Sequence, residues 1–214
     1  MSKVLIAMPN IGGIPPKVAS CLFRLAKRIN ADSVAFLDCS LIYDARNDFA
    51  LEAINGGYDE LLFIDSDIIF PDDCYEKLKA LDADIATGIY YGRRGKHNPI
   101  IYKEITPLRL TEDGKDFIPA ESKPFDEIPE GTFEVKGCGM GMCLIKTKAL
   151  DEICEVSHNA PFEPYMGLGE DLAFCYRANQ LGLTIKANSY IPLGHIGERV
   201  YTKEDYGIYT TIRK

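Results

Sequence analysis

Short apolar segments alternate with segments of helical periodicity along the first 91 residues of the chain. Four apolar segments have the length of buried strands, at residues 4–8, 34–37, 58–64 and 84–91. Between them, apolar residues recur at helical spacing and predict helices over residues 18–29, 47–55 and 74–81. This order predicts an α/β fold with a mostly parallel central sheet and helices on both of its faces.

Residues 103–131 interrupt the alternation. They are rich in proline and carry eight acidic residues against four basic ones, with few long apolar runs. We therefore expect a small surface excursion of hairpins and loops. Beyond it, further strands are predicted at residues 142–145 and 184–191, with a helix that begins near Glu170.

Composition excludes several classes of protein. The net charge of −8 argues against a general nucleic-acid or membrane surface, because both need clustered Lys and Arg. Seven cysteines without a Cys-x-x-Cys pair predict reduced, mostly buried thiols. No apolar stretch approaches about 20 residues and the amino terminus lacks a signal pattern, so we expect a soluble, cytoplasmic protein.

Asp65 and Asp67 lie where the apolar run at residues 61–64 ends. The carboxyl ends of buried parallel strands are where open α/β sheets bind ligands. Carboxylates are costly to leave unpaired there, and they are favourable if they hold a divalent cation beside a phosphate-bearing substrate. The alternative is that they stabilise the start of the helix signalled by Pro71, Asp72 and Asp73.

Asp171 lies in the first turn of a predicted helix and continues its apolar face, which comprises Asp171, Phe174, Cys175, Ala178 and Leu181. The helix dipole favours the ionised carboxylate that a general base needs. The dipole also weakens that base, unless burial or a neighbouring carboxylate such as Glu170 offsets the effect. The alternative role is stabilisation of the helix start.

Gly137, Gly139 and Gly141 form a glycine cluster directly before the predicted strand at residues 142–145. Their spacing and the strand that follows do not match a dinucleotide-binding motif. The glycines permit either a close approach of the backbone to a ligand or a β-bulge or tight turn. Both interpretations stay open at this point.

His195 follows the predicted strand at residues 184–191 and has Gly194 and Gly197 nearby. Small neighbours allow its ring to reach a metal ion, although a hydrogen-bonded structural role is the alternative. His97 and His158 have no comparable setting, and we predict that they are structural.

Four features follow one another in an order that a known family also has. Ala45-Arg46-Asn47 comes first, then a helix ending in Gly56-Gly57 and a strand ending in Asp65-Ser66-Asp67. Residues 137–141, Gly169-Glu170-Asp171 and His195-Ile196-Gly197 come later. This arrangement, over about residues 42–197, resembles the family 2-like glycosyltransferases of GT-A fold.

The resemblance implies a single GT-A-like (Rossmann-like) domain over residues 1–214. Residues 1–100 would be the nucleotide-binding half, 103–131 the surface excursion, 132–197 the acceptor and catalytic half, and 198–214 a carboxyl-terminal tail. The Gln-x-x-Arg-Trp motif of processive enzymes is absent, because the chain has no tryptophan. A single sugar transfer from a nucleotide-diphosphate sugar to a hydroxyl acceptor is therefore implied.

Roles for individual residues also follow from the resemblance. Asp171 would be the catalytic base, and Asp65, Asp67 and His195 would hold Mn²⁺ or Mg²⁺. The donor would be a UDP- or GDP-linked sugar, and Arg46 and Asn47 would face its diphosphate. The full set of predicted nucleotide-sugar contacts is Pro9, Asn10, Arg46, Asn47, Asp65, Ser66, Gly139, Met140, Gly141 and Glu170.

Two other functions remain as alternatives. A haloacid-dehalogenase-like phosphohydrolase would use Asp65 as a nucleophile and Asp67 beside it. A non-catalytic module would bind a nucleotide sugar or Ca²⁺ through the same residues.

Two further segments bear on substrates and partners. We predict a solvated turn at Arg93-Arg94-Gly95-Lys96, although it could reach the diphosphate. Acceptor choice is predicted to lie in residues 103–131 and in the terminal segment with Tyr201, Tyr206 and Tyr209, which could form a lid or a homodimer contact.

Overall fold

The computed structural model describes residues 2–10, 12–29, 31, 33–38, 41–93, 96–197 and 200–205 of the chain. Its largest sheet has seven strands in the order β10-β13-β5-β12-β3-β1-β2. These strands are β1 (Val4–Asn10), β2 (Ser33–Asp38), β3 (Glu60–Ile64), β5 (Ile85–Ile89), β10 (Thr132–Glu134), β12 (Met142–Lys146) and β13 (Ile185–Pro192).

Strand direction in this sheet confirms the predicted α/β class. β1, β2, β3, β5 and β13 run in one direction, and β10 and β12 run in the other. The antiparallel β12 lies between β3 and β5, an insertion that the sequence pattern does not reveal. Because β12 is antiparallel, its first residue Met142 pairs with Ile64, the last residue of β3. The glycine cluster before β12 is thereby placed at the end of β3 that carries the aspartates.

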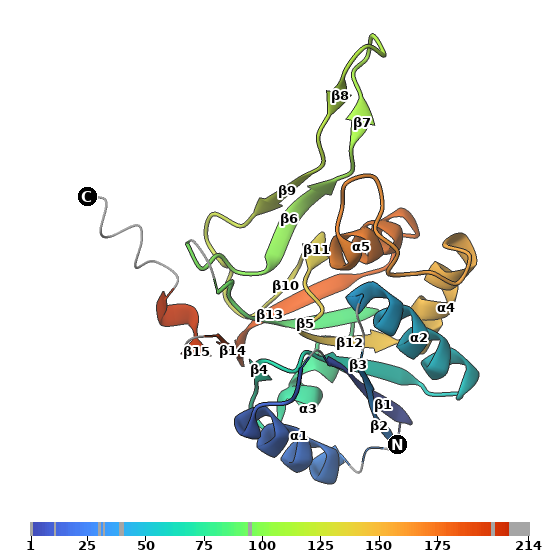
Figure 1. Cartoon of the computed structure of the whole chain (residues 1–214). Helices are drawn as coiled ribbons and strands as arrows, with labels where there is room; N and C mark the ends of the chain where they lie inside the picture. The colour runs from blue at the N-terminus through green and yellow to red at the C-terminus, as the bar shows by residue number, and fades with distance from the viewer. Residues whose placement is uncertain are drawn as a thin grey trace.

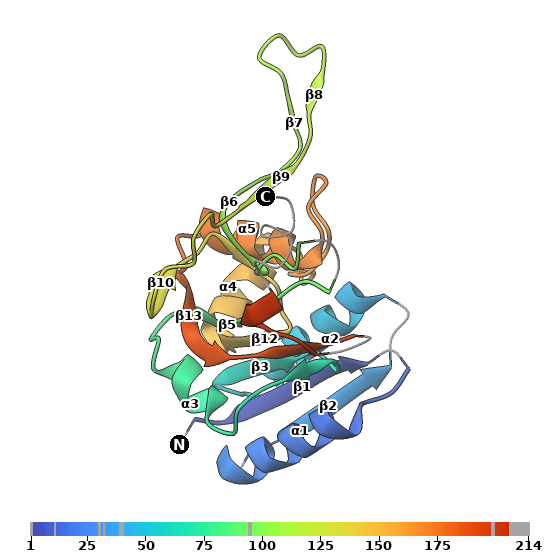
Figure 2. The ribbon, with the colours of Figure 1, turned by 90° about the vertical axis from the view of Figure 1, so that its left-hand side faces the viewer.

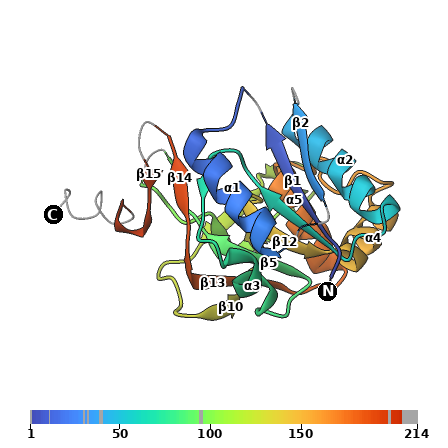
Figure 3. The same cartoon turned by 90° about the horizontal axis from the view of Figure 1, so that it is seen from below.

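Helices cover both faces of the sheet, as predicted (Figure 2). On one face lie α1 (Pro16–Ile29) and α3 (Cys74–Lys79), which Figure 3 shows in front of the sheet. On the other face lie α2 (Ile42–Asn55), α4 (Thr147–Val156) and α5 (Glu170–Gln180). Each face has its own apolar core, one with Leu22, Leu25 and Leu78 and one with Phe49, Ile153 and Phe174.

Several predicted element boundaries are wrong, and three of them have a clear local reason. α2 begins at Ile42 and not at Asn47, because no glycine or proline interrupts the helix there and Ala45 is buried like Phe49. β3 begins at Glu60 and not at residue 58, because the chain turns at Gly57, where φ is +63°. α5 ends at Gln180, so Leu181 lies beyond the last turn with 36% of its surface exposed and does not join the apolar face.

The excursion at residues 103–131 is a long hairpin, confirming the predicted departure from the α/β pattern (Figure 1). Its base is formed by β6 (Ile101–Thr106) and β9 (Glu121–Pro124), with β11 (Gly137–Cys138) paired to β6. Its distal part is formed by β7 (Arg109–Leu110) and β8 (Phe117–Ile118). We call residues 107–120 the arm.

Several predictions fall on residues outside the described part. These are one of the seven cysteines, Cys39, together with Arg94, Gly95, Tyr206, Tyr209 and the side chain of Tyr201. The six described cysteines are all buried and free of disulfides, as the composition predicts. Within the described ranges, no helix has the length and apolar character needed to cross a membrane.

Candidate functional site

Asp65 and Asp67 lie at the carboxyl end of β3 in a tight turn. The turn is closed by the N–H of Ile68, which donates to the carbonyl of Asp65 at 3.1 Å. The helix-start alternative for these aspartates is wrong, because α3 begins only at Cys74 and both carboxylates bind other partners. Ser66 lies between them in the same turn, half-buried.

Arg46 connects Asp65 to Asp171 beneath this turn. Its Nη2 atom donates to Asp65 Oδ1 at 3.2 Å and lies 3.6 Å from Asp171 Oδ1. Arg46 comes from α2 and only 1% of its surface is exposed, whereas Asp65 and Asp171 are each about a quarter exposed. Three residues far apart in the sequence therefore form one buried charge cluster.

Asp171 has the environment of a carboxylate with raised basicity. It lies in the first turn of α5, and its Oδ2 accepts a hydrogen bond from the Met140 N–H at 3.2 Å. Burial raises the pKa of Asp171 to about 6, against the opposing charge of Arg46 and with help from the nearby charges of Glu170 and Asp65. Burial and Glu170 thus offset the helix dipole, as the sequence reasoning required.

The ionisation of the other groups in this cluster follows from the same contacts. Burial raises the pKa of Asp65, although the charge of Arg46 opposes the shift. Burial alone would lower the pKa of Arg46, but the charges of Asp171 and Asp65 outweigh it and raise that pKa. Arg46 is therefore a permanent buried cation shared by two carboxylates.

Asp67 pairs with His195 and Arg93. A small sheet of β15 (Val200–Tyr201), β14 (Gly194–Ile196) and β4 (Ile68–Ile69) places His195 opposite Ile68, and His195 Nε2 lies 3.3 Å from Asp67 Oδ2. Arg93 Nη1 contacts the same oxygen at 2.9 Å. Burial alone would raise the pKa of Asp67, but its contacts with His195 and Arg93 hold it below its usual value.

His195 is oriented by a backbone contact. Its Nδ1 lies 2.8 Å from the carbonyl oxygen of Tyr91, which can only accept, so Nδ1 carries a proton and donates it. The other ring nitrogen, Nε2, faces Asp67, and holding the ring through Nδ1 is the arrangement by which proteins aim Nε2 at a metal ion.

The Asp67–His195 pair has a spacing that suits a shared cation. Two ligand atoms at right angles, each about 2.1 Å from one Mg²⁺ or Mn²⁺, lie about 3.0 Å apart, close to the observed separation. Asp65, the third predicted ligand, is turned toward Arg46. Among the described residues no three ligand side chains are already gathered around one point, so the predicted set is not preassembled.

The glycine cluster makes room for Tyr90. A Cβ atom on Gly139 would lie 2.0 Å from the Tyr90 hydroxyl, and one on Gly141 would lie 2.9 Å from the Tyr90 ring. The Gly141 N–H also donates to that hydroxyl at 3.3 Å. The buried Tyr90 ring packs edge-on against His195, with ring centroids 5.3 Å apart. Tyr90 thereby joins the glycine turn to the Asp67–His195 pair.

The other residues predicted to contact the nucleotide sugar lie around this charge cluster and differ in burial. Pro9 and Asn10 end β1 beside Asp65, since Ala7 pairs with Phe63 two residues earlier. Asn47 is one residue after Arg46, and its side-chain oxygen accepts a hydrogen bond from the Phe162 N–H at 2.8 Å.

Glu170 opens α5 next to Asp171 and is half-buried. Met140 is buried, so its backbone is the part that faces Asp171.

One residue of the site has no counterpart among the predicted site residues. Tyr90 lies inside a strand-like run and gives no local signal. Arg93 is about half exposed, as the predicted solvated turn requires, and it also pairs with Asp67. His97 is buried and bonded to the Gly92 carbonyl at 2.7 Å, in keeping with a structural role.

A cavity of about 500 Å³ lies beside the site, between the end of β13, β14 and the 3₁₀ turn Lys203–Asp205. Tyr91 and Gly194 are part of its wall and flank the contacts of His195, but the three site aspartates are not. Its other walls include Ile89, Ile191 and Leu193. This mainly apolar lining suits an uncharged group better than a diphosphate.

Comparison with known structures identifies the fold. The chain is similar to the crystal structure of A197 from STIV, with a TM-score of 0.65 and 21% identity over 95% of this chain and 91% of that one. It is also similar to the crystal structure of GalNAc-T7 with UDP, GalNAc and Mn²⁺, with a TM-score of 0.53 and 11% identity. That alignment covers 96% of this chain and 45% of GalNAc-T7.

The fold is GT-A-like. At these identities the similarity establishes the fold and nothing finer. No protein-family model matches the sequence, and no curated protein does.

Proposed function

We propose that this protein is a metal-dependent glycosyltransferase that moves one sugar from a nucleotide-diphosphate sugar to a hydroxyl acceptor. The observation that carries the proposal is the convergence of separate motifs at one edge of the sheet. Arg46, Asp65 and Asp171 meet within 3.6 Å, and Asp67 meets His195 at 3.3 Å. The motif order of the sequence thus corresponds to one compact site on a GT-A-like fold.

The donor side of the proposed site comprises Asp67, His195 and Asp65. Asp67 and His195 would hold Mn²⁺ or Mg²⁺, with Asp65 as a further ligand, and Arg93 would lie beside the diphosphate. The bound cation would neutralise the negative charge that develops on the leaving nucleotide diphosphate. GalNAc-T7, which shares the fold, was crystallised with UDP, GalNAc and Mn²⁺, and this supports a UDP- or GDP-linked donor.

The acceptor side comprises Asp171 and its neighbour Glu170. Asp171 would take the proton from the acceptor hydroxyl as the hydroxyl oxygen bonds to the anomeric carbon of the donor sugar. The bond between that carbon and the diphosphate oxygen breaks, and the nucleotide diphosphate leaves with the electron pair. The Met140 N–H orients the Asp171 carboxylate for this step through its bond to Oδ2.

The alternatives gain no support from the structure. A haloacid-dehalogenase-like phosphohydrolase is not favoured, because the fold is GT-A-like. A purely binding module would not need an aspartate whose pKa is raised, as that of Asp171 is. It would also not need the buried Arg46 that connects Asp171 to Asp65.

A thermal-shift panel tests the proposal. The protein would be heated with UDP- and GDP-linked sugars, with and without Mn²⁺, because a ligand that binds the native state raises the melting temperature. We expect stabilisation by one nucleotide class only in the presence of Mn²⁺, followed by transfer to a hydroxyl acceptor in a product assay. Stabilisation by no nucleotide sugar, or robust hydrolysis of simple phosphate esters, would contradict it.

A further inference from the structure

The guanidinium of Arg46 makes its described polar contacts through one nitrogen atom. That atom, Nη2, lies 3.2 Å from Asp65 Oδ1 and 3.6 Å from Asp171 Oδ1. Its Nε and Nη1 atoms are buried without a hydrogen-bond partner in the described part of the chain, as is Asp171 Oδ1. The guanidinium carbon lies 5.5 Å from the centroid of the Phe63 ring, so an aromatic face covers part of the group.

A buried guanidinium with unpaired nitrogen atoms is energetically unfavourable in a protein interior. The Arg46 side chain is only 2% exposed, so it does not act at the surface. Its burial fixes the guanidinium between two carboxylates, one at the end of β3 and one on α5. Nη2 lies nearer to Asp65 Oδ1 than to Asp171 Oδ1, by 0.4 Å, so in this state the stronger contact of Arg46 is with Asp65.

We propose that Arg46 is a positioning residue that couples the donor-side carboxylate Asp65 to the base Asp171, so that a cation on Asp65 releases Arg46 to Asp171. This inference rests on the proposed function, because it takes Asp65 as a ligand of the donor's cation. A cation and the Arg46 guanidinium compete for the same carboxylate. When the cation occupies Asp65, the full charge of Arg46 turns to Asp171 and holds its carboxylate in place for the acceptor.

The coupling must be reciprocal, because each ligand changes the affinity for the other by the same factor. If Asp171 is neutral, Arg46 has only Asp65 to bind and competes more strongly with the cation. The charge on Asp171 therefore changes the affinity of the metal site for its cation, although Asp171 does not contact the cation. Binding of donor and cation before the acceptor is the order that this arrangement favours.

A double-mutant cycle on Mn²⁺ affinity tests the coupling without any sugar or acceptor. Mn²⁺ binding to the whole chain would be measured by titration calorimetry in the wild type, Asp171→Asn, Arg46→Met and the double variant. We expect Asp171→Asn to weaken Mn²⁺ binding at least about fivefold more in the wild-type background than in the Arg46→Met background. Arg46→Lys is a second background, because it keeps the buried charge but has a single donor group in place of the planar fork.

Asp73→Asn is the matched control. It removes an exposed carboxylate that pairs with Lys77 at 3.0 Å, away from Arg46 and Asp171. Its effect on Mn²⁺ affinity should be the same in all backgrounds, within about twofold, because it acts only through distance. Melting temperatures confirm that each variant is folded.

The outcomes separate this inference from the proposed function. Mn²⁺ binding with additive effects of Asp171→Asn and either Arg46 substitution would overturn the coupling and leave the glycosyltransferase proposal intact. An equally non-additive response of Asp73→Asn would also overturn it, since the coupling would then not be specific to Asp171. Absence of Mn²⁺ binding by the wild-type chain would overturn the metal site and the coupling together.

Discussion

At the scale of single residues, the site is a balance of buried charge. Asp65 and Asp171 are held close together in a protein interior, where two carboxylates repel each other and lose hydration. Burial, with help from the charges of Glu170 and Asp65, raises the pKa of Asp171 to about 6, although the charge of Arg46 opposes the shift. A carboxylate with that pKa is ionised at neutral pH and is a stronger base than an exposed aspartate.

At saturating Mn²⁺, Asp171→Asn should still bind the donor but lose transfer by at least about 10²-fold, the usual contribution of a positioned general base. In the wild type, a pKa of about 6 means that the base is progressively protonated below that pH. We expect kcat/KM to fall about tenfold per pH unit below pH 6 and to be flat above it. Steady-state kinetics between pH 4.5 and 8 measure this, and wild-type turnover in the variant would remove Asp171 from the mechanism.

Asp67→Ala should abolish Mn²⁺ binding, because it removes the carboxylate that lies 3.3 Å from His195 Nε2. The matched control is Asp73→Ala, which removes an exposed carboxylate paired with Lys77 one helical turn away. Titration calorimetry with Mn²⁺ distinguishes the two. An unchanged affinity in Asp67→Ala would remove this residue from the metal site.

At the scale of elements, short strand pairings bring distant segments to the site. β12 lies antiparallel to β3, and the Gly141 carbonyl accepts the Asp65 N–H at 2.9 Å. β14 pairs with β4, and the Ile196 N–H donates to the Asp67 carbonyl at 2.7 Å. Both pairings anchor the backbone of the aspartate turn, so the turn is fixed independently of its side chains.

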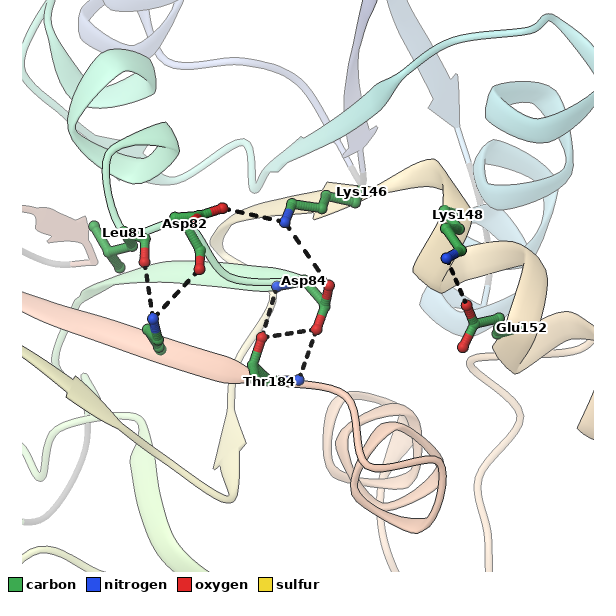
Figure 4. A network of polar contacts seen from close by, with 8 residues as sticks. Leu81, Asp82, Asp84, Lys146, Lys148, Glu152 and Thr184 are labelled. Carbon is green, nitrogen blue, oxygen red and sulfur yellow. Dashed lines mark hydrogen bonds and ion pairs between the residues drawn. The ribbon is translucent and has the colours of Figure 1, made fainter.

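The amino-terminal end of β5, away from the aspartate turn, is fixed by a polar network around Asp84 (Figure 4). Asp84 Oδ2 accepts from the Thr184 N–H at 2.9 Å and the Thr184 hydroxyl at 2.7 Å, and Lys146 Nζ lies 3.8 Å from Oδ1. These contacts join the starts of β5 and β13 to the end of β12. Burial alone would raise the pKa of Asp84, but the hydrogen bonds from Thr184 and the charge of Lys146 hold it below its usual value.

Asp84→Ala should lower the free energy of unfolding by about 1–3 kcal/mol, the range for hydrogen bonds to a charged group. Because the folded-state pKa is depressed, this stabilisation is present above the unfolded pKa of about 3.9 and is lost as the pH falls below it. Urea unfolding at pH 7 and pH 3 would measure the difference, which should shrink at pH 3.

The control for that experiment is the exposed pair of Lys148 and Glu152 on α4, which is 3.9 Å long and also appears in Figure 4. Its removal should leave stability unchanged within error, because solvent screens such pairs. A loss as large as that of Asp84→Ala would contradict the special role of the Thr184 hydrogen bonds.

At the scale of the whole molecule, the arm stands apart from the core. Figures 1 and 2 show it projecting from the body of the protein. The cross-strand pair of Leu110 and Phe117 is exposed, at 55% and 66%. The root of the arm is held by the Leu108 N–H, which donates to the Met166 carbonyl at 2.7 Å. The described contacts thus tie the root, and not the distal hairpin, to the body.

Replacement of residues 109–118 by a short glycine-containing turn should therefore leave the melting temperature within about 2–4 °C of the wild type, a change of about 1 kcal/mol for a chain of this size. Mn²⁺ and donor binding should also persist, because the aspartates and His195 lie on other elements. Differential scanning calorimetry measures the first and titration calorimetry the second. A large drop in melting temperature would show that the distal arm packs against the core.

Much of this molecule was predictable because the relevant physics is local. Apolar periodicity reported the strands that became β1, β3, β5, β12 and β13, and it identified residues 103–131 as a departure from them. The end of β3 placed Asp65 and Asp67, and the helix-start signal placed Asp171 in the first turn of α5. Each of these predictions depends only on neighbours within a few residues.

Local sequence patterns specify the α/β class, the elements that carry the acidic residues, and the ends of the strands at which those residues gather. The partners of these residues depend on the folded arrangement. The insertion of β12, the burial of Arg46 between Asp65 and Asp171, and the pairing of Arg93 with Asp67 all depend on which distant segments become neighbours. Periodicity reports which face of an element is buried, but contacts between elements far apart in the chain are set by strand order and register, which no local pattern encodes.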